Sequence, residues 1–334
     1  MSVPELRYCP GTLKEGYNTY SPSILRNVFN GKQVSHILPY RSPKRDADTD
    51  ELFMENRKRI SISGVQEKLS LIQDKNKLRL TELGELGTHI LKPIPVDLKI
   101  VEEVPANEQL TMQIAAQVYG IKTAANALIF FKDGEPAYIT KRFDVRGNGT
   151  KWNKEDFASL AGKTIENAGP NYKYEYDYVR LGKLIQHYIP AWRVEIEKYF
   201  SLVIFNFLFS NGDAHLKNFA VLESVSGDYL LSPAYDLINT RLHVDDTPFA
   251  LDDGLMETGF RSPGYQKTGY PEYNDFVNFG IAIGVIEKRI EKLLSQFCER
   301  QTMVETLINH SYLSESSKRG YLLGYATRRN QICK

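Results

Sequence analysis

The sequence contains little cysteine and almost no net charge, and each absence excludes a class of protein. Its three cysteines, Cys9, Cys298 and Cys333, are scattered and odd in number. They offer neither a disulfide framework nor a metal-binding quartet, so we expect no zinc. Unpaired thiols are typical of a reducing cytoplasm, where we place the protein. The 42 basic and 41 acidic residues leave a net charge of +1, so no overall field attracts the chain to nucleic acid or to a membrane.

Long apolar runs are also missing. Residues 1–14 have no apolar segment after a positively charged one, so we expect no signal peptide. The most apolar stretch, Tyr199–Phe209, is too short to cross a bilayer and predicts a buried helix instead. The rest is an ordinary composition of 42% hydrophobic and 25% charged residues in 334. A chain of this length exceeds what one compact core usually holds, so we expect two packed lobes.

The pattern of residues changes from strands to helices along the chain. Residues 1–50 predict an irregular arm with one short helix near Pro22–Phe29, followed by a charged lead-in over Asp46–Arg59. Alternation and helical spacing then predict strands over 60–64, 68–72, 78–80, 88–92, 127–131 and 137–143, and a helix over 104–119. Later segments predict helices over 155–161, 178–188, 193–211, 276–279, 286–297 and much of 300–330, with a hairpin of 219–222 and 229–231.

This order predicts an α+β protein with a two-lobed, kinase-like fold. We divide it into an N-terminal arm (residues 1–58), a strand-rich N-lobe (59–147) and a helix-dominated C-lobe (148–334). Catalytic residues then belong in the cleft between the two lobes.

A polar loop follows the most apolar predicted helix. In it, Asp213 and Asn218 stand five residues apart, with His215 and Lys217 between them. Phosphoryl transfer needs a carboxylate to orient or deprotonate a hydroxyl, oxygen ligands for magnesium, and cations for the phosphates. The catalytic loop of protein kinases places its Asp and its metal-binding Asn at this same separation. Such residues also form ordinary turns, so the loop alone leaves both interpretations open.

A second carboxylate strengthens the catalytic interpretation. Asp236 follows the predicted strand 229–231 and takes the place of the metal-binding Asp of a kinase, although no Phe-Gly comes after it. In the first lobe, Lys92 ends a strand and would reach the phosphates, and Glu108 on the next helix would pair with it. A lone Lys or Glu is usually solvated surface, and only the order of elements favours these two.

Six segments occur in the order of a known family. They are Ser61–Lys68, Thr88–Lys92, Lys141–Asp144, Glu155–Asp156, Asn211–Asn218 and Pro233–Asp236. Together they resemble the HipA-type serine/threonine kinases of bacterial toxin–antitoxin systems, over about residues 59–330. Because few residues precede the first motif, the chain resembles the short HipT-like members, in which a separate small protein replaces an N-terminal domain.

The resemblance implies a role for each matching residue. Asp213 is the catalytic base, Asn218 and Asp236 bind Mg²⁺, and Lys92 contacts the phosphates of ATP. The other implied nucleotide contacts are Ser63, Gly64, Val65, Gln66, Glu67 and Lys68 in the phosphate loop, Lys141, Arg142 and Phe143 beside the adenine, and His215, Lys217 and Tyr235.

The resemblance also implies regulation and partners. Autophosphorylation of Ser61 or Ser63 would add close to two negative charges where the ATP phosphates must sit, and so silence the kinase. The implied substrate is a protein, an aminoacyl-tRNA synthetase. The implied partners are small antitoxin proteins, one of them helix-turn-helix, through which any contact with DNA is made.

Two other functions stay open at this point. A small-metabolite kinase would share the nucleotide site and differ in the second lobe, and labelled phosphate would then not appear on a protein band. An inactive pseudokinase that binds a partner or acts as co-repressor is less favoured. Decay usually removes one of the four key residues, and Lys92, Asp213, Asn218 and Asp236 are all present.

Overall fold

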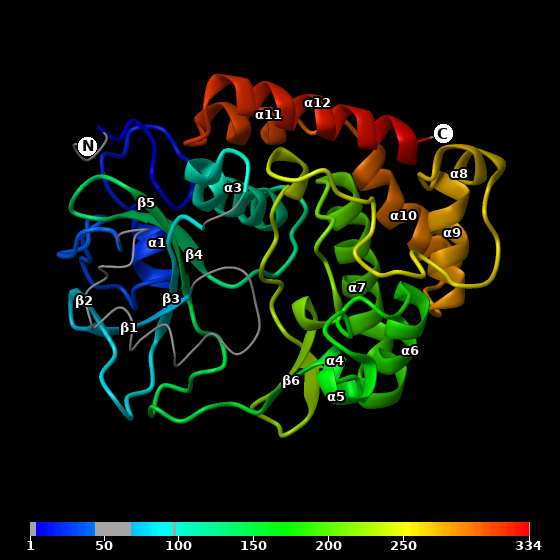
Figure 1. Cartoon of the computed structure of the whole chain (residues 1–334), viewed down its shortest axis with the longest axis horizontal. Helices are drawn as coiled ribbons and strands as arrows, with labels where there is room; N and C mark the ends of the chain where they lie inside the picture. The colour runs from blue at the N-terminus through cyan, green and yellow to red at the C-terminus, as the bar shows by residue number, and fades with distance from the viewer. Residues whose placement is uncertain (1–4, 44–67, 96–97, 334) are drawn as a thin grey trace.

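A computed structural model of the chain describes residues 5–43, 68–95 and 98–333. They form a strand-rich lobe beside a helix-rich lobe (Figure 1), which confirms the two-lobed α+β fold. One hydrophobic cluster joins the arm to one face of the larger sheet. The second cluster covers the other face and continues into the helices of the C-lobe. No helix in the described part of the chain is long and apolar enough to span a membrane.

The N-lobe is built on a five-stranded antiparallel sheet with the strand order β2-β1-β3-β5-β4. Its strands are β1 (Leu69–Asp74), β2 (Lys77–Leu80), β3 (His89–Lys92), β4 (Asn126–Phe130) and β5 (Pro136–Lys141). The predicted partner of β1 over 60–64 lies outside the described residues, and β1 pairs with β2 and β3. A short helix η1 (Val101–Glu103) leads into α3 (Val104–Gln117), which packs on β4 and β5.

The arm is folded onto the sheet. It contains the expected short helix, α1 (Pro22–Asn27). The Tyr20 hydroxyl donates a hydrogen bond to the Leu128 carbonyl at 2.7 Å, and the Gln109 amide donates one to the Gly11 carbonyl at 2.6 Å. Leu69, Leu71 and other residues of the sheet share the arm's apolar cluster. The arm therefore buries one face of a sheet whose other face is covered by α3.

The C-lobe surrounds the long apolar helix α7 (Trp192–Leu208), which packs against α6, α10 and α12. The other helices are α4 (Phe157–Leu160), α5 (Ile165–Ala168), α6 (Tyr178–Tyr188), α8 (Pro263–Thr268), α9 (Tyr273–Ala282), α10 (Glu287–Cys298), α11 (Thr302–His310), α12 (Glu315–Ile332), and the short η2 (Leu216–Asn218) and η3 (Thr240–Leu242). A small sheet has the order β6-β7-β8, made of β6 (Lys154–Asp156), β7 (Ala220–Glu223) and β8 (Tyr229–Leu231).

The prediction of a helix over 155–161 is wrong for its first two residues. Residues Lys154–Asp156 form β6 and pair with β7, and the helix begins only at Phe157. The Asp156 carboxylate accepts a hydrogen bond from the Ser159 backbone N–H at 3.0 Å and so caps the helix at its N-terminus. A residue that serves as the N-cap has extended backbone, so the segment before it is free to pair as a strand.

The helix α12 connects the two lobes along the top of Figure 1. The hydroxyls of Tyr321 on α12 and Thr111 on α3 lie 2.8 Å apart. Further along α12, the buried Arg328 guanidinium stacks over the Tyr270 ring at 4.3 Å and lies 3.5 Å from the Ser210 hydroxyl. Since Ser210 directly precedes the polar loop Asn211–Asn218, α12 links this loop to the N-lobe.

We expect His89 to make the protein less stable in mild acid. Its ring is fully buried, its Nε2 donates to the Val28 carbonyl at 2.9 Å, and burial lowers its pKa to about 4. The unfolded chain, with an ordinary histidine pKa near 6.5, binds this proton first, so stability falls as the pH drops from about 6.5 to 4. The slope contributed is at most about 1.4 kcal/mol per pH unit.

Urea unfolding at several pH values tests this expectation. His89→Gln should make the free energy of unfolding less dependent on pH in this window, whereas the exposed His187→Gln should leave the slope unchanged. An unaltered slope in His89→Gln would contradict a buried neutral histidine.

Candidate active site

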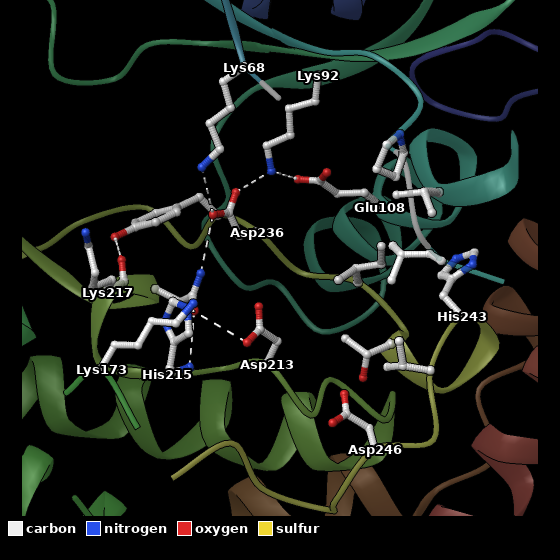
Figure 2. Close-up of a pocket in the computed structure, with 18 of the residues that line it drawn as sticks. Lys68, Lys92, Glu108, Lys173, Asp213, His215, Lys217, Asp236, His243 and Asp246 are labelled. Carbon is white, nitrogen blue, oxygen red and sulfur yellow. Dashed lines mark hydrogen bonds and ion pairs between the residues drawn. The ribbon is translucent and has the colours of Figure 1, made fainter. Parts of the chain in front are cut away.

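A cavity of about 620 Å³ lies between the lobes and collects most of those predicted residues that the structure describes (Figure 2). The predicted residues in its wall are Lys68, Lys92, Glu108, Asp213, His215, Lys217, Asn218, Tyr235 and Asp236. The first three come from the N-lobe and the others from the C-lobe. Motifs that are far apart in the sequence thus meet at one site.

Lys92 lies at the centre of a buried group of charges. Its Nζ is 2.6 Å from the Glu108 Oε1 and 2.5 Å from the Asp236 Oδ1. Only 5% of the Lys92 side chain and 2% of the Glu108 side chain are exposed. Burial alone would lower the pKa of Lys92, but the two carboxylates outweigh it and raise this pKa. Conversely, Lys92 and Lys68 overcome the effect of burial and hold the pKa of Asp236 well below its usual range.

The hairpin of β7 and β8 explains why Asn218 and Asp236 meet. Asn218 ends η2 just before β7, and Asp236 comes shortly after β8, so the pairing of the two strands brings both to one end of the hairpin. The Asn218 Nδ2 lies 3.3 Å from the Asp236 Oδ2. Asp236 has a φ of 56°, in the left-handed region that non-glycine residues rarely occupy and that clusters at functional sites.

Asp213 lies on the floor of the cavity with 51% of its side chain exposed. Its Oδ1 accepts a hydrogen bond from the Tyr174 hydroxyl at 2.9 Å. The surrounding protein raises the pKa of Asp213, although the nearby Lys173 ammonium opposes this shift. His215 Nε2 is 3.8 Å from the same oxygen, too far for a hydrogen bond. Burial lowers the pKa of His215 to about 3, so this ring is neutral at physiological pH.

The Thr240 hydroxyl holds the backbone at the start of the polar loop by two hydrogen bonds. The Thr240 hydroxyl donates to the Ser210 carbonyl at 3.0 Å and accepts from the Gly212 N–H at 2.9 Å. A Cβ on Gly212 would lie 2.5 Å from the Asp246 carboxylate and 2.7 Å from the Thr247 carbonyl. Position 212 therefore requires glycine, because residues 246–247 pass so close to the loop.

The donor set is suited to magnesium. Mg²⁺ prefers oxygen ligands and is often bound by one or two carboxylates together with phosphate oxygens. Asp236 supplies a carboxylate and Asn218 an amide oxygen at the same end of the cavity. The Asn218 Oδ1 accepts a hydrogen bond from the His215 N–H at 3.1 Å, and the amide nitrogen faces Asp236, so the amide must turn if its oxygen is to share a metal with Asp236.

The residues predicted beside the adenine have other partners. Lys141 Nζ donates to the Asn30 side chain at 2.6 Å, and Arg142 forms a two-pronged ion pair with Asp144. The Phe143 ring packs against Tyr235 at 5.8 Å between centroids. These three residues are not among those that line the cavity in the described part of the chain, and their contact with adenine stays a prediction.

The phosphate loop is described only at its last residue. Ser61 and residues 63–67 lie outside the described residues. Lys68 is described, and its Nζ is 3.8 Å from the Asp236 Oδ2.

Sequence reasoning missed several residues of the cavity wall, and three of them lie beside predicted ones. Lys173 and Tyr174 come from the loop between α5 and α6, and Lys154 comes from β6. The Lys154 Nζ lies 5.1 Å from the centre of the Tyr235 ring, and burial lowers its pKa while Asp144 opposes the shift. Their neighbours in sequence show no periodicity or motif that would mark them, apart from the Glu155–Asp156 pair beside Lys154.

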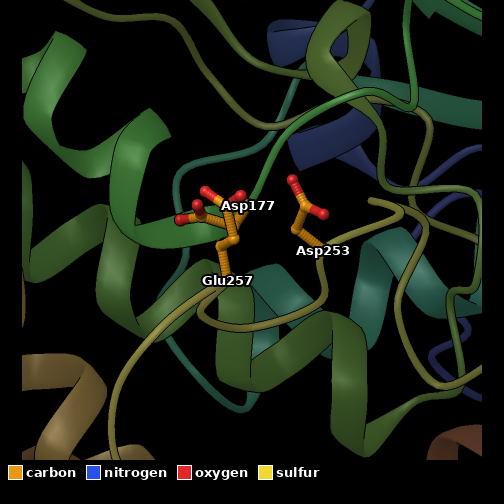
Figure 3. Close-up of side chains that lie close together, drawn as sticks. All are labelled: Asp177, Asp253 and Glu257. Carbon is orange, nitrogen blue, oxygen red and sulfur yellow. The ribbon is translucent and has the colours of Figure 1, made fainter.

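Figure 3 shows a separate group of acidic side chains in the C-lobe. Asp177, Asp253 and Glu257 bring three carboxylates together. Arg180 forms an ion pair with each of them, at 2.6 Å to Asp177 and 3.6 Å to Glu257. Asp177 also caps α6 by accepting from the Arg180 N–H at 2.7 Å. One guanidinium contacts all three carboxylates and links α6 to the segment 253–257, so the group helps to hold this part of the lobe together.

Comparison with protein families identifies the chain. The family model of the HipA-like C-terminal domain matches residues 60–304. The chain belongs to this HipA-like family. The match covers both lobes and includes the segments that carry Lys92, Asp213 and Asp236, which places the cavity at the centre of the HipA-like domain.

Curated relatives of this HipA-like chain carry kinase names. A protein of Haemophilus influenzae named "Putative kinase" is 27% identical over 316 residues, 90% of this chain and 89% of its own length. The "Putative kinase Y4mE" of Sinorhizobium fredii is 30% identical over 199 residues, 57% of this chain but only 44% of its own length.

Among solved structures, the chain is similar to HipA of Shewanella oneidensis MR-1, in a complex with HipB and operator DNA. The TM-score is 0.60 at 20% identity, over 81% of this chain and 63% of that one. This likeness supports the fold, and the chain spans less than two thirds of that HipA.

We expect the protein to lose much of its stability when the Lys92 ammonium is removed. Lys92→Met leaves the buried Glu108 carboxylate without a partner, which should destabilise the protein by about 3–5 kcal/mol. Burial raises the pKa of Glu108, and without the Lys92 ammonium, which opposes this shift, the pKa rises further. The carboxyl then takes up a proton in acid, so the loss relative to wild type should be larger at pH 8 than at pH 5.

Urea unfolding measures both effects. The double variant Lys92→Met with Glu108→Gln removes the unpaired charge and should recover most of the loss, while the exposed Lys77→Met serves as the control. A Lys92→Met variant as stable as wild type at pH 8 would show that Glu108 is not held as an ion.

Proposed function

We propose that the protein is an ATP-dependent serine/threonine protein kinase that acts as the toxin of a HipA/HipT-type toxin–antitoxin system. The observation that carries this proposal is the single cavity shared by Lys92, Asp236 and Asp213. A cation for phosphates, a carboxylate for the metal and a carboxylate for the acceptor hydroxyl are the parts that phosphoryl transfer requires. Membership of the HipA-like family and the kinase names of its relatives support the same activity.

In the proposed reaction Asp213 acts on the acceptor. It orients the substrate hydroxyl and takes its proton while the hydroxyl oxygen forms a bond to the γ-phosphorus of ATP. The bond from that phosphorus to the bridging oxygen breaks, and ADP leaves with the electron pair. The raised pKa of Asp213 suits it to this work, since a base is more effective when its pKa lies closer to the working pH.

Lys92, Asn218 and Asp236 act on the nucleotide. We propose that Lys92 binds the phosphates and that Asn218 and Asp236 hold Mg²⁺, which when bound neutralises charge on the phosphates. Lys68 ends the predicted phosphate loop, and its Nζ lies 3.8 Å from the Asp236 Oδ2 at this end of the cavity, where we propose that it contacts the nucleotide. We further propose that Ser61 or Ser63 in this loop is the autophosphorylation site.

The proposed target is an aminoacyl-tRNA synthetase, and the proposed partners are small antitoxin proteins. The HipA of Shewanella oneidensis, which has the same fold, was solved with HipB and operator DNA. By analogy, we propose a helix-turn-helix partner that makes the DNA contacts. The near-neutral charge of this chain agrees with an indirect contact.

Intact-mass measurement after incubation with Mg-ATP tests the kinase. The wild-type chain should gain one phosphate, and Asp213→Asn should gain none, because the amide cannot accept the hydroxyl proton. Asp228→Asn, an exposed Asp in the turn between β7 and β8, is the matched control and should behave as wild type. Loss of the mass shift in Ser61→Ala or in Ser63→Ala identifies the acceptor.

The substrate is tested with labelled ATP and purified aminoacyl-tRNA synthetases. Label on a synthetase band supports the toxin, whereas label confined to small molecules would favour a metabolite kinase. Absence of both a mass shift and magnesium-dependent nucleotide binding would refute the proposed activity.

A further inference from the structure

Tyr174 contacts the residue that we propose as the base. Its hydroxyl donates to the Asp213 Oδ1 at 2.9 Å. Among the residues that the structure describes, it is the one side chain that hydrogen-bonds this carboxylate. A carboxylate has two oxygens and accepts several hydrogen bonds, so Tyr174 occupies one oxygen and leaves the other toward the cavity.

The loop that carries Tyr174 is fixed to the polar loop that it serves. The Leu216 N–H donates to the Lys173 carbonyl at 3.1 Å, which ties the two loops together next to Asp213. On the other side, the Asp252 N–H donates to the Tyr174 carbonyl at 2.9 Å. The Tyr174 ring also packs edge-on against His215, with 5.3 Å between centroids. Backbone and ring are therefore held on three sides.

We propose that Tyr174 is a positioning residue for Asp213, and this inference rests on the proposed kinase function. Its hydroxyl holds the Oδ1 of Asp213 in one orientation, so that the Oδ2 faces the acceptor hydroxyl. The arrangement resembles other catalytic sites in which a third group orients the base. Lys173, the preceding residue, places an ammonium near Asp213 and stabilises its ionised form.

A different role for Tyr174 would be to occupy the acceptor position itself, as an internal block. The geometry favours the positioning role. A block must leave for each substrate, but the backbone of Lys173 and Tyr174 is bonded to two other segments, at Leu216 and Asp252. Half of the Asp213 side chain also stays exposed beside the bound tyrosine, so the acceptor has access without any movement.

Tyr174→Phe removes the hydroxyl and keeps the ring. The initial rate of phosphate incorporation into the chain, followed by intact mass at saturating Mg-ATP, should fall about tenfold. This corresponds to about 1.4 kcal/mol, the lower end of a hydrogen bond to a charged group. The ATP concentration that gives half of the rate should not change, because Tyr174 acts on the base. Tyr172→Phe, in the same loop, is the matched control, since the described structure gives its hydroxyl no hydrogen bond.

A second measurement is independent of activity. Carbon-13 NMR of Asp-labelled protein, with Asp213→Asn to assign the signal, gives the titration of Asp213. The Tyr174 hydrogen bond lowers the pKa of Asp213, so Tyr174→Phe should raise it and Tyr172→Phe should not. Lys173, His215, Asp236 and Lys68 also face this carboxylate and are the same in both variants.

The outcomes separate the two claims. An unchanged or faster rate in Tyr174→Phe, or phosphate found on Tyr174 itself, would overturn the positioning role. If the wild-type chain transfers no phosphate, the proposed function fails. The titration then tests only the contact between Tyr174 and Asp213. An unchanged pKa of Asp213 in Tyr174→Phe overturns this contact.

Discussion

The ammonium of Lys92 is buried between the lobes, and the position of one lobe relative to the other depends on the two carboxylates with which it pairs. One of its carboxylates, Glu108, stands on α3 of the N-lobe, and the other, Asp236, follows β8 of the C-lobe. A buried charge that loses its partner costs several kcal/mol. The two lobes are therefore held in the one relation that brings both carboxylates to the same ammonium.

Hydrogen bonds beside this ion group make the same connection through the backbone. Asn107, the neighbour of Glu108 on α3, accepts from the Asn239 N–H at 3.2 Å and donates to the Asn239 carbonyl at 2.8 Å. Asn239 lies three residues after Asp236, and Thr240 beside it supports the polar loop at Gly212. A displacement of α3 would thus move the partner of Lys92, the segment after Asp236 and the loop of Asp213 together.

Local sequence patterns were sufficient for the strands, the hairpin and most helices, because alternation and helical spacing reflect which face of each element is buried. The spacing of Asp213 and Asn218 and the order of Lys92 and Asp236 predicted these four residues of the cavity wall, while their roles stay predictions. The docking of the arm could not be predicted, because it depends on single aromatic side chains such as Tyr20 in a polar, irregular segment. Tyr174 escaped prediction for the same reason: its role follows from a contact across 39 residues, which no local pattern records.

The pairing of Lys92 also constrains how a nucleotide would enter. The Lys92 ammonium already pairs with two carboxylates, so a phosphate that approaches it competes with Asp236. A phosphate that replaces Asp236 leaves this carboxylate with the Lys68 ammonium, 3.8 Å away, and the neutral Asn218 amide, 3.3 Å away. An anionic ligand by itself therefore exchanges one strong ion pair for another. A divalent cation that arrives with the phosphates changes this balance, because it gives Asp236 a new partner as Lys92 turns to the phosphates. The charges of the cavity thus favour an anion that arrives with a divalent cation over either one alone.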